Sequence, residues 1–325
     1  MNSYGTLFKV TLYGESHQEA IGVVVDGMIP GTPIDEQLIR ADLDQRKPGA
    51  IGTTPRKEAD DFKITSGVFN GLATGSPIHV MIENQHVKSK DYEHLVHQPR
   101  PGHADFVSNV KYQGFQDYRG GGRFSGRLTA ALVVAGSLAK MMLPYTFTSE
   151  LTRVGDLTDL SHLDAYLEEI AAKGDSVGGI VKVVVKDIPV GLGEPFFNKL
   201  DAEIAKMVMS LPAVKGVSFG AGFEAADKLG SEWNDVFINE RGITKTNHSG
   251  GVSGGISNGN DLIVKVLIKP TSSIQKDQQT FDFKDKAVNP LSIGGRHDVA
   301  IIRRIPIVLE NAIAIVLADL MLLAS

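Results

Sequence analysis

The sequence of 325 residues predicts a single domain of the α+β class, in which separate strands and helices are spread along the whole chain. Alternating or continuous apolar runs predict strands at 8–13, 21–25, 62–66, 76–83, 179–186 and 262–268. Apolar residues at helical spacing predict helices that open at Thr32-Pro33, Ser125, Ser161, Asp201 and near Pro306. No repeat, low-complexity tract or linker divides the sequence, so we expect one domain over residues 1–325.

The composition excludes several classes of protein. The chain has no cysteine, which excludes disulfides, thiolate metal sites and thiol catalysis. Its net charge of −5 argues against a protein that binds nucleic acid over its whole surface. Hydrophobic residues make up 42 %, enough for a sizeable core, and the 35 glycines indicate many turns.

No segment is expected to cross a membrane. The most apolar stretch, 305–323, is interrupted by Glu310, Asn311 and Asp319, which favours a packed amphipathic helix. Only short apolar runs occur near the N-terminus, so we expect no signal peptide. A cytoplasmic location is consistent with these features and with the lack of cysteine.

The most informative stretch is 117–143. Three arginines crowd the start of its predicted helix: Arg119, Arg123 and Arg127. A helix N-terminus already carries unpaired N–H groups and a partial positive charge, so three cations there predict a pocket for an anion such as phosphate or carboxylate. Ser125 stands at the N-cap position, and the glycines at 120–122 let a ligand approach the backbone. A glycine-rich surface turn with solvated arginines is the alternative.

Two loop histidines are candidate acids or bases. His17 follows Ser16 in a polar segment between two predicted strands, where side chains can face a cleft. His103 follows Arg100 in a turn stiffened by proline; the cation favours a neutral His103, whereas a bound phosphate would favour its protonated form. The alternative for each is a solvated histidine. No metal site is expected from the other loop histidines, whose spacing fits one only loosely: His86, His94 and His97.

Two further segments offer hydrogen-bond donors to phosphate. Residues 247–259 form a second glycine-rich loop, and the strand at 262–268 runs directly into Lys269-Pro270-Thr271-Ser272-Ser273. One lysine and three hydroxyls can together donate several hydrogen bonds to one phosphate. Neither glycine loop has the spacing of a dinucleotide fingerprint or a P-loop, and a plain tight turn is the alternative for 247–259.

Other charged residues complete the set of candidates. Arg296 precedes Asp298 by two residues and offers an anion clamp beside a carboxylate base, with a structural salt bridge as the alternative. Arg46 ends a predicted helix, where a cation is favourable whatever the function. Residues 50–60 have few apolar side chains and are predicted to form a mobile loop. The residues alone thus indicate an enzyme for phosphorylated, carboxylated small molecules without identifying the reaction.

Six motifs follow the order and approximate spacing of one known family. They are Gly14-Glu15-Ser16-His17, Arg100-Pro101-Gly102-His103-Ala104-Asp105, Tyr118 through Thr129, Asn247-His248-Ser249-Gly250-Gly251, Lys269 through Ser273, and Arg296-His297-Asp298. On these motifs the chain resembles the chorismate synthases from Gly5 to the last helix. The resemblance implies a homotetrameric β-α-β sandwich that uses reduced FMN to convert 5-enolpyruvylshikimate 3-phosphate to chorismate and phosphate by anti-1,4-elimination.

The same resemblance implies roles for individual residues. His17 would protonate reduced flavin, His103 would assist phosphate departure, and Asp298 would act as base through flavin N5. Substrate would be bound by Ser16, Arg46, Ser125, Arg127 and Arg296. Flavin would contact Arg123, Phe124, Ser125, Ala213, Gly254, Arg296 and, at its phosphate, Lys269, Pro270, Thr271, Ser272 and Ser273.

The sequence departs from the family pattern at three places. Gln18 replaces a residue that is usually small, and Phe124 replaces a frequent serine. The segment 50–54 lacks an arginine that many relatives carry, for which Arg56 is a candidate substitute. Nothing in the sequence indicates an intrinsic flavin reductase, so we expect an external, NAD(P)H-dependent supply of reduced flavin.

Two other classes of function share some of these features. A flavin-dependent oxidoreductase would have the same FMN site but would consume NAD(P)H in proportion to product. A non-catalytic phosphate- or RNA-binding module would use the same arginines without needing His17 or His103, and its binding would fall steeply with salt.

Overall fold

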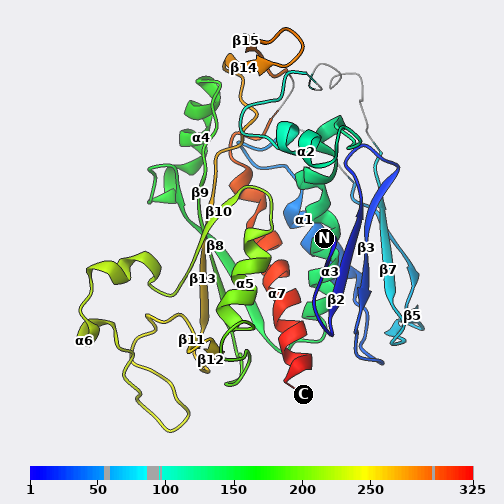
Figure 1. The fold of residues 1–325 in the computed structure, drawn as a ribbon. Helices are drawn as coiled ribbons and strands as arrows, with labels where there is room; N and C mark the ends of the chain where they lie inside the picture. Colours follow the sequence, from blue (N-terminus) through cyan, green and yellow to red (C-terminus); the bar gives the residue numbers. More distant parts are fainter. Residues whose placement is uncertain (55–58, 86–94, 96, 295–296, 325) are drawn as a thin grey trace.

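The computed structural model describes residues 1–54, 59–85, 95, 97–294 and 297–324. In this part of the chain, a layer of helices lies between two antiparallel sheets (Figure 1). The predicted α+β sandwich is therefore confirmed. Each sheet turns its apolar face towards the helices, which bury their own apolar side chains against both sheets.

Nine strands form the two large sheets. The first sheet has the order β1 (Ser3–Tyr4), β2 (Lys9–Gly14), β3 (Ala20–Asp26), β7 (Ile78–Glu83) and β4 (Phe62–Ser66). The second has the order β10 (Val214–Phe219), β13 (Leu262–Ile268), β9 (Gly179–Lys186) and β8 (Thr146–Val154). Burial alternates along β7, β9 and β13, as expected for strands with one face on a core.

The helix layer consists of α1 (Glu36–Arg46), α3 (Thr129–Lys140), α5 (Leu200–Met209) and α7 (Pro306–Leu323). The close approach of α3 to α7 depends on Gly136. A Cβ at Gly136 would lie 2.4 Å from the backbone oxygen of Asn311, so any larger residue would force the two helices apart.

Helix α7 is the centre of the core. By length and composition it could cross a membrane, but 72 % of its residues are buried inside the protein. It is buried on all sides, so the expectation of an amphipathic helix is wrong. Near its end, the Asp319 carboxylate accepts hydrogen bonds from the amides of Thr6, Leu7 and Phe8 at 2.7–3.0 Å. These bonds fix the N-terminal segment to α7.

Two helices begin at a different cap from the one predicted. For α1 the N-cap is Asp35, whose carboxylate accepts from the amides of Gln37 and Leu38 at 2.8 and 3.1 Å. Helix α4 (Leu163–Ala172) follows a 3₁₀ turn (Leu160–His162) that is capped by Asp159, not Ser161. In both places an aspartate carboxylate accepts the unpaired N–H groups at the start of the helix or turn.

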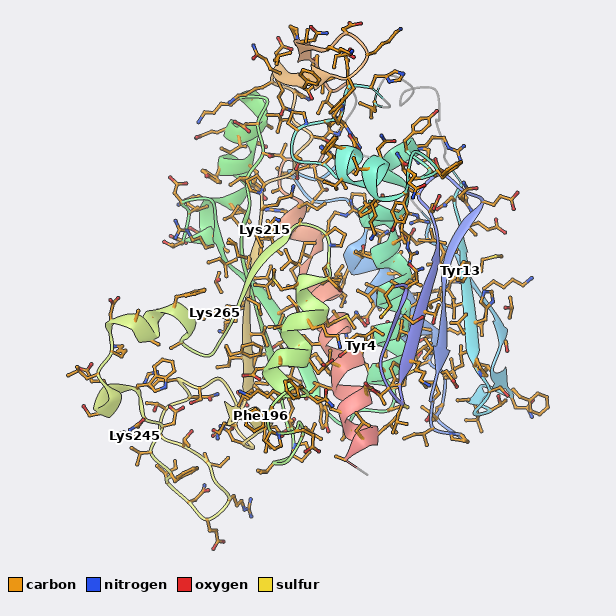
Figure 2. All side chains as sticks on the ribbon, in the orientation of Figure 1. Tyr4, Tyr13, Phe196, Lys215, Lys245 and Lys265 are labelled. Carbon is orange, nitrogen blue, oxygen red and sulfur yellow. The ribbon has the colours of Figure 1, made fainter. Side chains whose placement is uncertain are left out.

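Shorter elements surround the three layers. They are the helices α2 (Asp105–Lys111) and α6 (Gly230–Trp233), the hairpins β5 (Val68–Phe69) with β6 (Leu72–Ala73), β11 (Val252–Ser253) with β12 (Ile256–Ser257) and β14 (Gln278–Asp282) with β15 (Ala287–Leu291), and 3₁₀ turns at Arg119–Phe124, Gly126–Leu128, Gly222–Asp227 and Ile301–Arg304. Tyr4 lies between the first sheet and α5 (Figure 2), and its hydroxyl donates to Glu203 at 2.8 Å. This bond ties the edge strand to the helix layer.

Candidate active site

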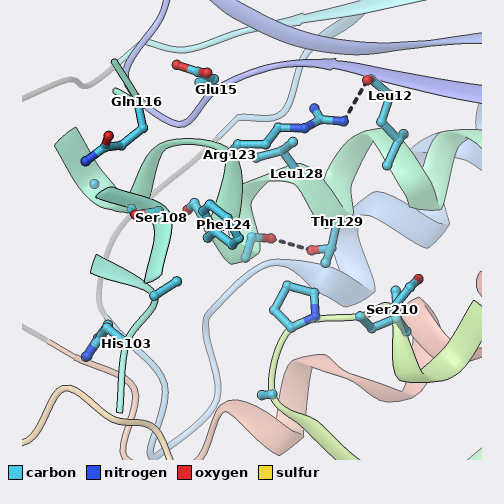
Figure 3. Close-up of a pocket in the computed structure, with 18 of the residues that line it drawn as sticks. Leu12, Glu15, His103, Ser108, Gln116, Arg123, Phe124, Leu128, Thr129 and Ser210 are labelled. Carbon is cyan, nitrogen blue, oxygen red and sulfur yellow. Dashed lines mark hydrogen bonds between the residues drawn. The ribbon is translucent and has the colours of Figure 1, made fainter. Parts of the chain in front are cut away.

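Two adjoining cavities lie beside the N-terminal end of α3. The first has a volume of about 1480 Å³ and the second about 840 Å³. Residues that line both include Arg100, Gly120, Ser125, Thr129, Ala213, Thr271 and Ile301. Figure 3 shows the first cavity, with Arg123 and Phe124 at one side and His103 at another.

Gly120 packs against the ring of His17. A Cβ at Gly120 would lie 2.0 Å from the Cε1 atom of His17, and its φ of +58° also favours glycine. The amide of Ser16 donates to the carbonyl of Gly122 at 3.2 Å. These contacts bury His17 and place Ser16 and His17 in the wall of the second cavity. The glycine triplet therefore shapes the site through its close contact with a histidine loop.

The sequence predicted that the three arginines near α3 form one anion pocket. In the structure their side chains do not converge, so this prediction is wrong. Arg119 pairs with Asp117 at 2.7 Å and lines neither cavity. Arg123 lines the first cavity and donates to the carbonyl of Leu12 at 2.7 Å (Figure 3). Arg127 lines the second cavity. The side chains diverge because the glycines between Arg119 and Arg123 have positive φ angles, so the backbone there is not a regular helix.

Ser125 is the predicted cap and lies between the cavities. Its hydroxyl accepts the N–H of Arg127 at 3.2 Å, at the start of the 3₁₀ turn that leads into α3. The neighbouring Phe124 lines the first cavity and remains 43 % exposed. Gln18, the other departure near these motifs, donates to Asp117 at 2.9 Å.

Asp60 is a buried carboxylate that the sequence analysis missed. Its Oδ2 atom accepts from Nη2 of Arg46 at 2.6 Å, and its Oδ1 atom accepts from Nη1 of Arg127. Burial alone would raise the pKa of Asp60, but the two arginines outweigh burial and hold the pKa below its usual value. The expectation of a mobile loop at 50–60 is wrong for this residue, whose side chain is fully buried.

Asp298 lies in the second cavity and is held by two donors. The amide of Thr54 donates to Oδ1 at 2.7 Å, and Nη1 of Arg304 lies 3.3 Å from Oδ2. Arg304 also donates from Nε to the carbonyl of Arg46 at 2.9 Å. Arg304 was not predicted, and it links the carboxylate to the end of α1.

His103 has both ring nitrogens engaged. Nδ1 lies 3.0 Å from the carbonyl of Pro101, which can only accept, so Nδ1 carries the proton. Nε2 then accepts from the hydroxyl of Ser273 at 2.9 Å. Burial, followed by the nearby Arg100, lowers the pKa of His103 to about 4. His103 is therefore neutral near pH 7, as the sequence analysis expected for the ligand-free state.

Residues 269–272 form one end of the first cavity, whereas Ser273 lines the second. Nζ of Lys269 donates to the carbonyl of Gly102 at 2.8 Å and lies 2.5 Å from the hydroxyl of Ser272. Burial, with a smaller effect of Lys215, lowers the pKa of Lys269. The buried Oγ1 atom of Thr271 has no hydrogen-bond partner within the described part of the chain. This group of donors suits a negatively charged ligand.

The remaining predicted residues fall into three groups. Ala213, with φ of +69°, lines both cavities, and Pro270 lines the first. Gly254 lies in the β11–β12 hairpin and lines neither cavity. Among the described residues, no group of three or more histidine, aspartate or glutamate side chains is placed to hold a metal ion. Four residues lie outside the described part of the chain: Arg56, His86, His94 and Arg296.

Comparison with known proteins identifies the family. A model of the chorismate synthase family matches residues 8–322. A chorismate synthase of Chitinophaga pinensis is 51 % identical over 99 % of this chain and 97 % of the relative, and one of Methanosarcina barkeri is 43 % identical over 99 % and 96 %. A crystal structure of a chorismate synthase has a TM-score of 0.77 and 25 % identity, and it covers 98 % of this chain and 93 % of that one. One family therefore matches this chain over almost its entire length and in its fold, and the chain belongs to the chorismate synthases.

Proposed function

We propose that the two cavities form a single active site in which 5-enolpyruvylshikimate 3-phosphate is converted to chorismate and phosphate. Reduced FMN would lie in the first cavity and the substrate in the second. The observation that carries this proposal is the shared wall, because Ser125, Ala213 and Thr271 line both cavities. Ligands bound in two adjoining cavities would lie in contact with each other.

The residues of the first cavity fit FMN. Its volume of about 1480 Å³ is ample, since ligand pockets typically have roughly 300–1000 Å³. A flavin phosphate beside segment 269–273 would accept from the Thr271 hydroxyl, which otherwise lacks a partner among the described residues. The same phosphate would offset the charge of Lys269, whose pKa is lowered by burial and by Lys215.

The residues of the second cavity fit a substrate with several negative charges. Arg46 and Arg127 line it together with the hydroxyls of Ser16 and Ser125. Guanidinium groups bind phosphate and carboxylate groups well because their N–H donors are fixed in one plane. When bound, reduced FMN supplies the electron density that favours cleavage of the C–O bond. Arg127 would stabilise the negative charge that develops on the departing phosphate.

The two histidines would handle protons on opposite sides of the shared wall. His103 is neutral with its proton on Nδ1, so Nε2 can take up a proton when a bound phosphate raises its pKa. His103 lines the first cavity, but its Nε2 accepts from Ser273, which lines the second, so His103 would assist phosphate departure across the shared wall. His17 lines the second cavity and packs against Gly120, which lines both cavities, so His17 would supply a proton to the flavin across the shared wall.

Asp298 would accept the proton that the substrate ring loses. Its carboxylate faces the second cavity, and the Thr54 amide and Arg304 fix its orientation. A base held by two donors on different segments is positioned before the substrate arrives, which reduces the reorganisation that proton transfer requires.

We extend the proposal to the whole protein on the basis of its family. The chain would form one domain, assemble as a homotetramer and work in the cytoplasm with flavin reduced by an external NAD(P)H-dependent enzyme. Large apolar side chains that remain exposed outside the core are consistent with assembly: Val190, Phe196, Phe197, Phe223, Phe237 and Ile238.

An anaerobic assay tests the proposal. The protein is mixed with dithionite-reduced FMN and the phosphorylated enol-ether substrate, and chorismate is followed without NAD(P)H. Formation of chorismate supports the proposal. Turnover that requires NAD(P)H in proportion to product would instead indicate an oxidoreductase.

A further inference from the structure

We propose that Asp60 is a positioning residue for the substrate, because its one carboxylate holds the guanidinium groups of Arg46 and Arg127 together in the wall of the second cavity. The inference rests on the proposed function of that cavity and adds a residue to it. The side chain of Asp60 is fully buried, so Asp60 acts through the two arginines.

The three residues come from distant parts of the chain. Arg46 is the last residue of α1, Asp60 precedes β4, and Arg127 lies in the 3₁₀ turn before α3. Each arginine binds a different oxygen of the carboxylate, Arg46 at Oδ2 and Arg127 at Oδ1. Since both arginines line the second cavity, this shared acceptor fixes the relative positions of two cations that face the same ligand.

The charges support the same role. The side chains of Arg46 and Arg127 are only 3 % and 10 % exposed, so water screens their mutual repulsion poorly. The Asp60 carboxylate lies between them and offsets that repulsion. These three side chains carry two positive charges and one negative charge, so Asp60 alone does not neutralise the arginines that face an anionic substrate.

Asp60 adopts a backbone conformation that turns its side chain inward. Its φ is +52°, a region that aspartate and asparagine tolerate better than most residues. The next residue, Asp61, has a side chain that is 64 % exposed and lies 3.4 Å from Arg40 on the surface. The chain thus provides two adjacent aspartates, each beside arginine, of which one is buried at the cavity and the other is not.

Each arginine also has a second anchor that does not involve Asp60. Nε of Arg127 donates to the side-chain oxygen of Asn84 at 3.0 Å. The carbonyl of Arg46 accepts from Arg304 at 2.9 Å. Loss of the Asp60 charge would therefore weaken the restraint on both guanidinium groups without detaching the arginines from the fold.

The test compares Asp60→Asn with the matched control Asp61→Asn. Asparagine has the same shape and tolerates the same φ, but it lacks the charge that restrains both arginines. Because hydrogen bonds to charged groups are strong, we expect the KM for the substrate to rise by about 10- to 100-fold in Asp60→Asn. Equilibrium binding of the substrate in the presence of oxidised FMN, which permits no turnover, should weaken by a similar factor. FMN affinity, and every parameter of Asp61→Asn, should stay within about twofold of wild type.

Inhibition by inorganic phosphate separates positioning from a general loss of structure. Inorganic phosphate is small enough to bind one guanidinium group wherever that group lies. Its inhibition constant should therefore change by less than about threefold in Asp60→Asn. An unchanged substrate KM with a smaller active fraction would overturn the proposal, and so would a loss of phosphate inhibition as large as the loss of substrate affinity. Failure of the wild-type protein to make chorismate would instead count against the proposed function.

A second pair of variants applies if Asp60→Asn does not fold. In the Arg127→Gln background one buried cation is absent, so the added Asp60→Asn change leaves no cation pair to repel. We expect the double variant to bind substrate several-fold more weakly than Arg127→Gln alone, because Arg46 has lost its ion pair with Asp60. Equal substrate affinities of the double and single variants would contradict the proposal.

Discussion

The two cavities differ in how they carry charge. The second cavity contains buried ion pairs in which Asp60 and Asp298 bind arginines. The first cavity has the larger volume and carries hydroxyl groups and Lys269 at one end and aromatic side chains such as Phe124 elsewhere. Its wall also contains one ion pair, Arg100 with Asp105 at 2.8 Å. Lys269 donates to the carbonyl of Gly102 and lies beside the hydroxyl of Ser272. Among the described residues, no carboxylate lies within ion-pair distance of Lys269.

This difference is the basis for the ligand that we propose for each cavity. Paired charges keep cations in fixed positions, which favours a small ligand with several anionic groups. A wide cavity with a phosphate-binding end favours a large, flat ligand that has one phosphate. The comparison therefore supports the proposed division into a substrate site and a cofactor site, and the following variants test that division.

The largest effect is expected for Asp298→Asn. Asparagine keeps an oxygen for the Thr54 amide but cannot act as a base, so elimination should fall by about 10⁴-fold, the upper end for proton transfer. FMN binding should be retained, as measured by the change in flavin absorbance. A variant that loses FMN instead would show that the carboxylate has a structural role across both cavities.

The histidine variants should have the next largest effect. His17→Ala and His103→Ala should each reduce turnover by about 10²- to 10⁴-fold, because each is assigned a proton transfer. Far-ultraviolet circular dichroism should remain that of the wild type. Normal turnover in both variants would remove these residues from the mechanism.

Lys269→Ala should affect only the cofactor side. Loss of one charged hydrogen bond to the flavin phosphate should weaken FMN binding by about 10- to 100-fold. Lys215→Ala is the control, since Lys215 influences Lys269 without lining either cavity. Equal FMN affinity of Lys269→Ala and wild type would contradict the assignment of segment 269–273 to the phosphate.

The smallest effect is a pH dependence of stability. The pKa of His103 falls from 6.5 to about 4 on folding, mainly because of burial. Between these values the unfolded chain binds a proton that the folded protein does not, so His103 destabilises the fold as the pH falls. Urea unfolding at pH 7 and pH 5.5 should show this loss, on the order of 1 kcal/mol. In His103→Gln the loss of unfolding free energy between pH 7 and pH 5.5 should be smaller by that amount. If the variant and the wild type show the same pH dependence, His103 does not have a lowered pKa in the folded protein.

Much of the fold could be predicted because strands and core helices leave local patterns. The alternating residues at 262–268 and the run that begins at Pro306 predicted β13 and α7 correctly. The environment of α7 could not be predicted, because its polar residues are satisfied by distant segments. Asp319, for example, binds amides more than 300 residues earlier in the chain.

The site was predicted only where a motif contained the residues. His17, His103 and Ser125 belong to motifs, and they line the cavities. Asp60 was missed because its partners lie 14 and 67 residues away, so nothing in its own segment indicates burial. Arg119 was grouped with Arg123 and Arg127 by spacing, although the positive φ angles of the intervening glycines direct it elsewhere.

The most direct test of the account is an experimental structure of the protein with oxidised FMN and 5-enolpyruvylshikimate 3-phosphate bound together. We predict that the flavin phosphate lies at segment 269–273 in the first cavity, and that the substrate lies in the second cavity on Arg46 and Arg127, next to Asp298. Substrate bound in the first cavity, or flavin bound away from segment 269–273, would contradict the separation of the two sites.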